Sequence, residues 1–576
     1  MVRTRNFSRR NHKRMGGMKV VIYPGHNSTV GLFGKETIVL QEEKFTNVKN
    51  QGGIPRCALE YLDLKDIDSF SVPMENMFSI FTGEVNPIEQ ASQGKLRRVW
   101  NWVEYKLGYK YPLVKRLMLW IRNTIYNKIV SPQSKRQFEN EIKPPIKVKY
   151  FDHHTCHCYS PVYFYNLKDR YLLFSMDGAG DGSFAKIFIH SPYNDTTISN
   201  SGFDASLGLL YSEVTRYLGM KPNDHEHKVM GLAAYTNFDP IAYRKLKQLV
   251  WLNKVNLTFK SKLNLNICQQ YLVENLKGIR FDHIAAAMQK LLEDYVVEWI
   301  EAAIEKTNIK KIACSGGVFM NVKLNKLIVE SEKVEKVYFM PSAGDESTIF
   351  GAHYLAGGRG SPQSMYLGLE YNNKEVKEFL KNYPYKTCLY DDIEFEIAEL
   401  LASKKIVARF QGRGEFGARA LGHRSILGNP SDIRTYYKIN DMIKKRDFWM
   451  PFAPTILEER ASDYIKNWDK LKDKVLESSR FMTVAFDSTP KAQRHFIAAM
   501  HPKDKTLRPQ ILNYKMDTGY HRLVKHFERR TGIGGVLNTS LNLHGYPLVG
   551  TLEQAMYTFE FSGLEYMAIE NFLISK

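Results

Sequence analysis

The stretch Tyr171-Leu172-Leu173-Phe174-Ser175-Met176-Asp177-Gly178-Ala179-Gly180-Asp181-Gly182-Ser183 contains the pattern from which the fold class can be predicted. Its first four residues are apolar and predict a strand, and the small and acidic residues that follow predict a turn. Glycines in such a turn let backbone N–H groups approach a phosphate, and the Asp side chains can hold a metal ion or its water. The stretch therefore predicts a phosphate-sized turn at the end of a strand.

A second copy of this pattern occurs near the start of the chain. In each copy, three strands follow one another and are joined by turns. The predicted strands are residues 19–23, 29–33 and 37–40 in the first copy and residues 171–174, 184–190 and 196–200 in the second. Two such meanders predict a duplicated α/β domain that binds a nucleotide between its halves, although single hairpins of this kind occur in any α/β protein.

The hexapeptide Asp152-His153-His154-Thr155-Cys156-His157 precedes the second copy. His153 and His157 are four residues apart, so a helix places both imidazoles on one face, where they can hold one metal ion. The alternative is a pair of histidines that only packs within the helix. A metal site beside a phosphate-binding turn indicates nucleotide-dependent group transfer.

The chain has 576 residues, which is too many for one hydrophobic core and predicts two or three domains. With 44% hydrophobic residues it is expected to be globular. No apolar run approaches the ~20 residues that a membrane span needs, and no signal sequence is evident. Six cysteines in so long a chain form no disulfide framework. These features predict a protein of the cytoplasm, viral or host, without a membrane partner.

The formal net charge of +20 is concentrated in two segments. Residues 1–18, a predicted flexible arm, are rich in Arg and Lys and contain no acidic residue. Residues 95–147 contain thirteen Lys and Arg against three Glu. They belong to a predicted helical insertion at about residues 90–147. Clustered cations indicate a polyanionic partner more strongly than an evenly basic surface does.

Aromatic residues are interleaved with the cations of this insertion, and apolar positions such as Leu113, Leu117 and Trp120 predict an amphipathic helix. Rings among Lys and Arg are typical of sites for single strands and flipped bases. The alternative, weighted equally, is a solvated helical insertion whose aromatic residues lie in a core. The candidate nucleic-acid contacts are Arg97, Arg98, Lys115, Arg116 and Arg122.

Further glycine-rich turns follow in the second half of the chain. A predicted helix and strand lead into Ser315-Gly316-Gly317, and the next strand leads to Asp345. Residues 356–362 read as a linker, after which a second domain is expected. There, residues 412–425 place three Arg in a glycine-rich loop, and Lys444-Lys445-Arg446 adds further cations. Guanidinium groups in such a loop bind oxyanions by paired hydrogen bonds.

Taken together, these blocks resemble the NodU/CmcH carbamoyltransferase family over nearly the whole chain. Any one block is modest evidence, but ten in the same order are highly specific. The matching blocks are residues 25–28, 42–46, 152–157, 177–181, 227–233, 315–321, 344–345, 412–425, 448–453 and 537–540.

The resemblance implies a duplicated actin-like ATPase (ASKHA) domain over residues 19–365 and an α/β YrdC-like domain over residues 390–576. It also implies an O-carbamoyltransferase. In this family carbamoyl phosphate and ATP, with Mg, form a carbamoyl-adenylate in the YrdC-like domain. The ASKHA-like domain then moves the carbamoyl group to an acceptor hydroxyl with the help of a divalent metal, most often Fe.

The family's functional residues can be transferred to matching positions. The implied metal ligands are His153, His157 and Asp345, and Asp177 completes the expected catalytic group. The expected nucleotide-binding residues are Gly178, Gly180, Asp181, Ser315, Gly316, Gly317 and Asn321. The residues expected to bind carbamoyl phosphate and ATP in the C-terminal domain are Arg413, Arg419, Arg424, Lys444, Arg508, Asn538, Thr539 and Ser540.

The acceptor does not follow from the resemblance. The basic segments favour a hydroxymethyl group of a pyrimidine in DNA, such as 5-hydroxymethylcytosine. The first alternative is a hydroxyl of a sugar or natural product. A second alternative, of another class, is a nucleotide-gated binding protein without transferase activity. A homodimer is also compatible with the sequence.

Overall fold

The computed structural model describes residues 17–62, 64, 67–77, 104, 106, 111–125, 128, 131–192 and 194–576. The N-terminal part contains two five-stranded sheets, and the first has the order β3-β2-β1-β4-β5. Apolar residues with buried side chains form these strands, as in Val20, Val21 and Ile22 of β1. The strands are β1 (Met18–Tyr23), β2 (Thr29–Phe33), β3 (Thr37–Gln41), β4 (Ile67–Val72) and β5 (Val148–Tyr150).

The second sheet has the order β8-β7-β6-β11-β12, which is the same connectivity. In both sheets the first three strands form an antiparallel meander, and the last two strands add parallel to the first strand. The strands are β6 (Tyr171–Gly180), β7 (Ser183–His190), β8 (Thr196–Gly202), β11 (Lys311–Ser315) and β12 (Lys336–Phe339). The predicted duplication of an α/β unit is therefore confirmed by strand order and direction.

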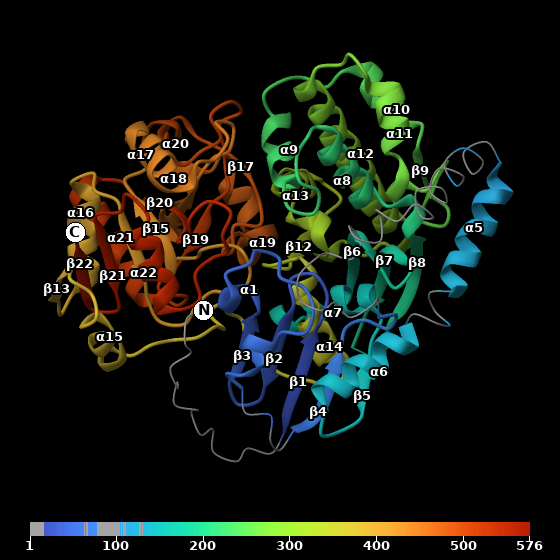
Figure 1. The fold of residues 1–576 in the computed structure, drawn as a ribbon. Helices are drawn as coiled ribbons and strands as arrows, with labels where there is room; N and C mark the ends of the chain where they lie inside the picture. The colour runs from blue at the N-terminus through green and yellow to red at the C-terminus, as the bar shows by residue number, and fades with distance from the viewer. Residues whose placement is uncertain are drawn as a thin grey trace.

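Each half places a helix against the sheet of the other half. Helix α7 (His153–Tyr165) follows β5 of the first sheet but packs on β6, β7 and β11 of the second. Helix α14 (Thr348–Leu355) follows β12 of the second sheet but packs on β1, β2 and β4 of the first. The two helices contact each other between the sheets (Figure 1). This exchange brings the start of α7, the end of β6 and the segment before α14 to one place.

Most of the remaining N-terminal helices form a lobe beside the second sheet, at the top of Figure 1. Its long central helix is amphipathic and buries Trp299 completely. The lobe contains α8 (Leu207–Tyr217), α9 (Glu226–Ala233), α10 (Pro240–Lys247), α11 (Gln269–Leu276), α12 (Phe281–Thr307), α13 (Val322–Glu330) and the hairpin of β9 (Val250–Asn253) with β10 (Thr258–Ser261). Two short helices, α1 (Glu43–Thr46) and α2 (Arg56–Leu59), follow the first meander.

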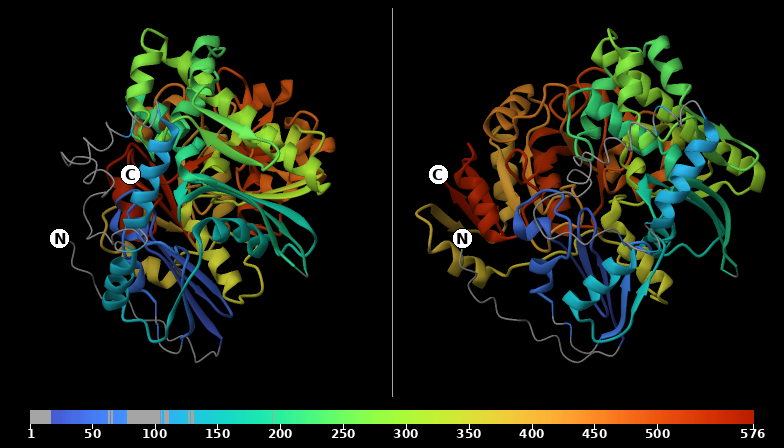
Figure 2. Two further views of the ribbon diagram at one scale, coloured as in Figure 1. Left: turned by 90° about the vertical axis from the view of Figure 1, so that its right-hand side faces the viewer. Right: turned by 45° about the vertical axis from the view of Figure 1, so that its right-hand side comes forward.

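The basic insertion contributes two described helices, α5 (Pro112–Ile125) and α6 (Ser131–Ile142), on the outer side of the molecule (Figures 1 and 2). The predicted amphipathic helix is thus present. The predicted basic arm lies almost wholly outside the described residues, and so do Arg97 and Arg98 and the side chain of Arg122. Among the described residues no helix is both long and apolar enough to cross a membrane.

The C-terminal domain is built on one eight-stranded mixed sheet with the order β13-β22-β21-β14-β15-β20-β16-β19. Helices α16 and α21 lie side by side against it. The strands are β13 (Lys386–Leu389), β14 (Val407–Phe410), β15 (Arg424–Gly428), β16 (Ala453–Leu457), β19 (Gln510–Leu512), β20 (Gly535–Ser540), β21 (Tyr566–Ile569) and β22 (Phe572–Ser575). The helices are α15 (Asn373–Leu380), α16 (Ile393–Ala402), α17 (Ile433–Ile439), α18 (Ala461–Tyr464), α19 (Trp468–Ser479), α20 (Pro490–His495), α21 (Thr518–Thr531) and α22 (Leu552–Glu560).

The two domains share a continuous hydrophobic core and are joined by hydrogen bonds. The buried Lys44 donates from Nζ to the backbone oxygen of Gly417 at 3.1 Å. From the C-terminal side, the indole nitrogen of Trp449 donates to the backbone oxygen of Lys228 at 3.1 Å. Because these bonds replace water at a buried junction, they fix the orientation of one domain against the other.

Candidate active site

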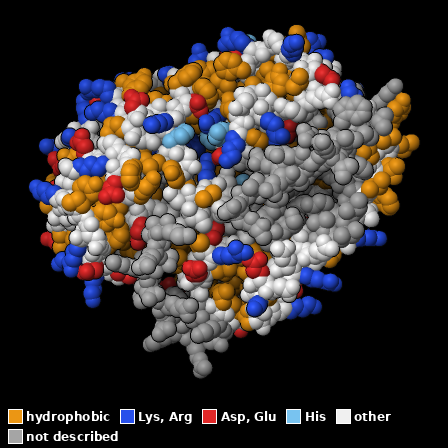
Figure 3. All heavy atoms as spheres, in the orientation of Figure 1, with side chains coloured by type: hydrophobic (Ala, Val, Ile, Leu, Met, Phe, Trp, Pro, Cys, Tyr) orange, Lys and Arg blue, Asp and Glu red, His pale blue; other side chains and the backbone are white. Residues whose placement is uncertain are grey.

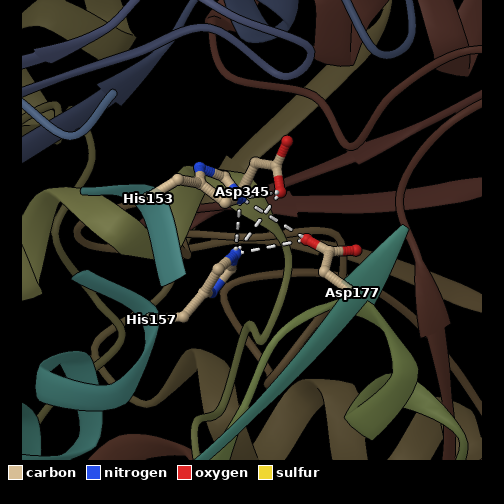
Figure 4. A group of neighbouring side chains, drawn as sticks. All are labelled: His153, His157, Asp177 and Asp345. Carbon is tan, nitrogen blue, oxygen red and sulfur yellow. Dashed lines mark hydrogen bonds and ion pairs between the residues drawn. The ribbon is translucent and has the colours of Figure 1, made fainter. Parts of the chain in front are cut away.

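Four side chains from three segments of the chain meet between the two halves of the N-terminal domain (Figure 4). They are His153 and His157 of α7, Asp177 of β6 and Asp345, which follows β12. The Nε2 atoms of the two histidines are 3.1 Å apart. The Nε2 atom of His157 lies 3.2 Å from Oδ2 of Asp177 and 3.5 Å from Oδ1 of Asp345. One ligand atom from each residue lies within 4.8 Å of all the others.

The helix start places the two histidines. Asp152 caps α7, because its Oδ1 accepts a hydrogen bond from the backbone N–H of Thr155 at 2.8 Å. Lys186 also donates to this oxygen, at 2.7 Å. On the far side of the ring, Nδ1 of His157 lies 3.3 Å from Oγ of Ser315. Such partners on the second ring nitrogen hold an imidazole in a fixed orientation.

The third histidine of the motif is directed elsewhere. His154 is fully buried, and its Nδ1 and Nε2 atoms lie 3.1 Å from Oγ of Ser175 and 3.0 Å from the backbone oxygen of Ser183. Burial, together with the charges of the two neighbouring histidines, holds the pKa of His154 well below its usual value. Both ring nitrogens are occupied, so His154 ties α7 to the strands beneath it.

The cluster is strongly polarised. Burial would lower the pKa of His153, but the charges of Asp345 and Asp177 outweigh it and raise this pKa well above the usual value. Burial would raise the pKa of Asp345, but the two histidines hold it well below the usual value. Carboxylates and imidazoles in so small a volume are typical of a cation site, since a metal ion satisfies all four lone pairs at once. The donor set suits Fe, Zn or Mn.

Tyr23 is a fifth member of the cluster that the sequence analysis did not identify. Its hydroxyl donates a hydrogen bond to Oδ2 of Asp345 and leaves Oδ1 directed at the histidines. Tyr23 ends β1, the first strand of the first copy, and Asp177 lies near the end of β6, the first strand of the second copy. The duplication was the available signal, because it places the ends of these strands at equivalent positions.

Tyr23→Phe is expected to weaken metal binding by about 10–100-fold, because the carboxylate of Asp345 loses the hydrogen bond that orients it. The measurement is metal affinity by competition with a chelator. Tyr211→Phe is the matched control, since the Tyr211 hydroxyl donates to Oε1 of Gln289 at 2.9 Å and neither residue belongs to the cluster. Equal metal affinity in the two variants would contradict the role assigned to Tyr23.

The expected nucleotide-binding turns pack directly against this cluster. A Cβ atom on Gly180 would lie 2.1 Å from Cδ2 of His153, and one on Gly317 would lie 2.8 Å from Oδ1 of Asp177. Gly316 has a φ of 101° and passes close to the backbone oxygen of Met176. Glycine is required at these points, because a side chain on Gly180 or Gly317 would displace a member of the cluster and one on Gly316 would clash with the backbone of Met176.

The other expected nucleotide-binding residues have different surroundings. Asp181 accepts hydrogen bonds from the backbone N–H groups of Glu75, Asn76 and His153. Asn321 caps α13 and exchanges hydrogen bonds with Gln289. The backbone N–H of Gly178 donates to Asp177, and a Cβ atom there would meet only Leu209, at 3.6 Å. Among the glycines expected to bind nucleotide, Gly178 is therefore the one with open space beside it.

The arginines expected to bind phosphate in the C-terminal domain divide into two groups. The first group hydrogen-bonds to backbone oxygens. Arg413 donates to the oxygens of Thr37, Leu367 and Gly368. Arg424 is fully buried, stacks on Phe410 and donates to the oxygens of Leu369, Gln411, Gly412 and His423. These two side chains hold loops in place.

Arg424→Met is expected to lower the free energy of unfolding by at least about 3 kcal/mol, because buried carbonyl oxygens lose their donors. The measurement is denaturant unfolding. Arg529→Met on exposed α21 is the matched control and should change stability by less than about 0.5 kcal/mol. An unfolding midpoint that is unchanged in Arg424→Met would contradict the structural role.

The second group, Arg419 and Arg508, forms a cationic cluster with Arg446, although Arg419 also donates one hydrogen bond to the backbone oxygen of Pro341, at 2.8 Å. Burial and the charge of Arg508 lower the pKa of Arg419 to about 9, and the same two causes lower the pKa of Arg446 to about 10. Burial alone lowers the pKa of Arg508 to about 10. The charge of Arg508 therefore acts on both Arg419 and Arg446. A pocket of mutually repelling cations is stabilised by a bound oxyanion.

Neighbouring polar groups complete this pocket. Thr539 Oγ1 lies 3.4 Å from a terminal nitrogen of Arg446. Lys444 donates to Oγ of Ser540 at 3.1 Å, and burial with the charge of Arg446 holds its pKa well below the usual value. Asn538 is buried and donates to the backbone oxygen of Ala420. The sequence indicated Arg446 only as a further cation, and the family resemblance implied its neighbour Lys444 as the phosphate-binding residue instead.

The candidate nucleic-acid contacts that the structure describes differ from each other. Lys115 is buried and pairs with Asp204 at 2.7 Å and with the backbone oxygen of Ser261 at 2.8 Å, so its charge is used within the protein. This differs from the expectation of a surface cation. Arg116, the next residue of α5, is exposed.

The chain was compared with known proteins. Residues 14–354 match the family described as Carbamoyltransferase N-terminus, and residues 398–576 match Carbamoyltransferase C-terminus. An uncharacterized protein of Methanocaldococcus jannaschii is 31% identical over 97% of this chain and 99% of its own length. The nodulation protein NolNO of Sinorhizobium fredii is 26% identical over 94% of this chain and 78% of its own length.

A third relative is named for its reaction. The 3'-hydroxymethylcephem-O-carbamoyltransferase of Amycolatopsis lactamdurans is 27% identical over 44% of this chain and 47% of its own length. Both domain matches and these relatives agree on one family.

Proposed function

This chain belongs to the carbamoyltransferase family, and from that premise we propose that it transfers a carbamoyl group to an acceptor hydroxyl through a carbamoyl-adenylate. One observation carries the proposal: two charged clusters of complementary kind occur, one in each family domain. The cluster around His157 suits a cation, and the cluster around Arg508 suits phosphates. The family favours this function over a binding protein without transferase activity.

We assign carbamoyl-adenylate formation to the C-terminal domain. Arg419, Arg446 and Arg508 bind the phosphates of carbamoyl phosphate and of ATP, which carries Mg. Hydrolysis of carbamoyl phosphate releases phosphate and leaves carbamate. A carbamate oxygen attacks the α-phosphorus of ATP and displaces pyrophosphate. Guanidinium groups suit this step because charge must be neutralised on several phosphoryl oxygens at once.

We assign the transfer step to the N-terminal domain. His153, His157, Asp177 and Asp345 would hold a divalent metal, and such an ion stabilises the negative charge that develops on an acyl or phosphoryl oxygen. Tyr23 and Ser315 orient two of these ligands. The turn at Gly178 leaves room for the adenylate phosphate. The acceptor oxygen attacks the carbamoyl carbon, AMP leaves, and the acceptor proton passes to a base.

The acceptor that we propose is a hydroxymethyl group, and the first candidate remains a pyrimidine in DNA. The name of the cephem relative supports a hydroxymethyl acceptor of some kind. The structure of the basic insertion supports a DNA acceptor less strongly than its amino-acid composition does, because Lys115 is buried. A sugar or natural-product hydroxyl remains the alternative.

The test incubates the protein with ATP, carbamoyl phosphate and duplex DNA that contains 5-hydroxymethylcytosine. We expect pyrophosphate release that requires both small substrates, and nucleosides heavier by one carbamoyl group after digestion. If pyrophosphate is released but the DNA gains no carbamoyl group, the acceptor would be assigned to the small molecules. Absence of any pyrophosphate release that depends on carbamoyl phosphate would refute the carbamoyl-adenylate.

A further inference from the structure

Helix α5 turns its apolar face away from the protein. Leu113, Leu117 and Trp120 are 77%, 56% and 64% exposed, and their spacing of four and three residues places them on one face. The opposite face contains Lys115, which is 7% exposed, and Met118. The helix therefore buries a lysine and a methionine while two leucines and a tryptophan face outward, unlike a helix whose apolar face packs on a core.

The inward face shows why this orientation is fixed. Lys115 pairs with Asp204 at 2.7 Å, and its Nζ donates to the backbone oxygen and to Oγ of Ser261. Turning α5 to bury its leucines would break these three interactions and leave Asp204 without this cation. The outward apolar face is thus held in place by polar contacts behind it.

Among its described residues this face has one exposed cation, and it belongs to a chain with a formal net charge of +20. Arg116 is exposed on the same side of α5, and the sequence of α5 contains no acidic residue. Hydrophobic side chains gather at the right edge of Figure 3, where α5 lies in Figure 1. Single exposed leucines are normal, but two leucines, a tryptophan and an arginine on two turns form one patch.

Contrary to the expectation of no membrane partner, which rested on the lack of a membrane span, we propose that α5 docks the enzyme on an anionic lipid bilayer, with Leu113, Leu117 and Trp120 at the headgroup–acyl boundary and Arg116 among the headgroups. Charge complementarity favours this occupant, because apolar side chains flanked by cations are typical of helices that lie in a membrane interface. A second copy of the chain would bring two basic surfaces together. A nucleic acid would leave the aliphatic leucines without stacking partners.

The test uses the full-length protein and vesicles of phosphatidylcholine with phosphatidylglycerol, without carbamoyl phosphate or ATP, so it is independent of the proposed function. We expect the protein to sediment with these vesicles and to bind vesicles of phosphatidylcholine alone more weakly. The variant L113S/L117S/W120S should lower the partition coefficient on the order of a hundredfold. Leu389→Ser is the matched control, because Leu389 is 62% exposed on β13 at the opposite side of the molecule (Figure 1).

Trp120→Phe provides a second measurement that does not depend on the folding of the triple variant. Vesicles should shift the tryptophan emission of the wild type to the blue, and this shift should largely disappear in Trp120→Phe. Equal sedimentation of the wild type and the triple variant would overturn the proposal. A dimer of the wild type that is lost in the triple variant would also overturn it, because the apolar face would then bind a second copy. Displacement of the protein from vesicles by duplex DNA that binds to α5 would overturn it as well.

Discussion

His157→Ala is expected to lower carbamoyl transfer on the order of 10³-fold while pyrophosphate release stays unchanged. His157 is fully buried and contacts both Asp177 and Asp345. Its loss would remove one of the proposed metal ligands and leave Asp177 without its nearest histidine nitrogen. The C-terminal pocket contains none of these residues, so formation of the carbamoyl-adenylate should continue. The measurements are acceptor carbamoylation, pyrophosphate release and metal content.

His154→Ala is the matched control for this prediction. His154 lies in the same helix and is equally buried, but its ring nitrogens contact Ser175 and Ser183 rather than the cluster. It should lose stability, as His157→Ala should, yet retain metal and transfer. Wild-type transfer by His157→Ala, or equal metal loss in both variants, would contradict the proposed metal site.

The second prediction has the opposite pattern. Arg508→Ala is expected to lower pyrophosphate release on the order of 10³-fold, because the guanidinium whose charge acts on both Arg419 and Arg446 would no longer neutralise phosphoryl charge. Metal content should be unchanged, since Arg508 is not part of the cluster around His157. Arg508→Lys should recover only part of the activity, because an ammonium group cannot bind two phosphate oxygens in the planar manner of Arg.

Arg494→Ala, on the exposed face of α20, is the control for removal of a guanidinium group and should leave pyrophosphate release unchanged. Arg508→Ala with wild-type pyrophosphate release would show that the phosphates bind elsewhere. Loss of metal in Arg508→Ala would show that the two clusters are not separate. Together the His157 and Arg508 variants separate the two half-reactions.

Much of this site could be predicted because its signals are local. The meander pattern and the spacing of His153 and His157 depend only on the periods of a strand and a helix. Asp177 and Asp345 follow predicted strands, and parallel strands of one sheet bring such positions to one edge. The approach of Gly317 to Asp177 could not be predicted, because it depends on the distance between the turns that follow the paired strands β6 and β11.

The sequence by itself determined the duplicated α/β unit, the pair of helix histidines and the glycine-rich arginine loop, because backbone preferences and side-chain periods act over a few residues. Only the tertiary structure decided that Tyr23 hydrogen-bonds to Asp345, that Arg424 donates to backbone oxygens whereas Arg508 lies near Arg419, and that α5 presents its leucines to the outside. The physical reason is the same in each case. A side chain's partner depends on which distant segment packs against it, and that segment is selected by burial and hydrogen bonding over the whole fold.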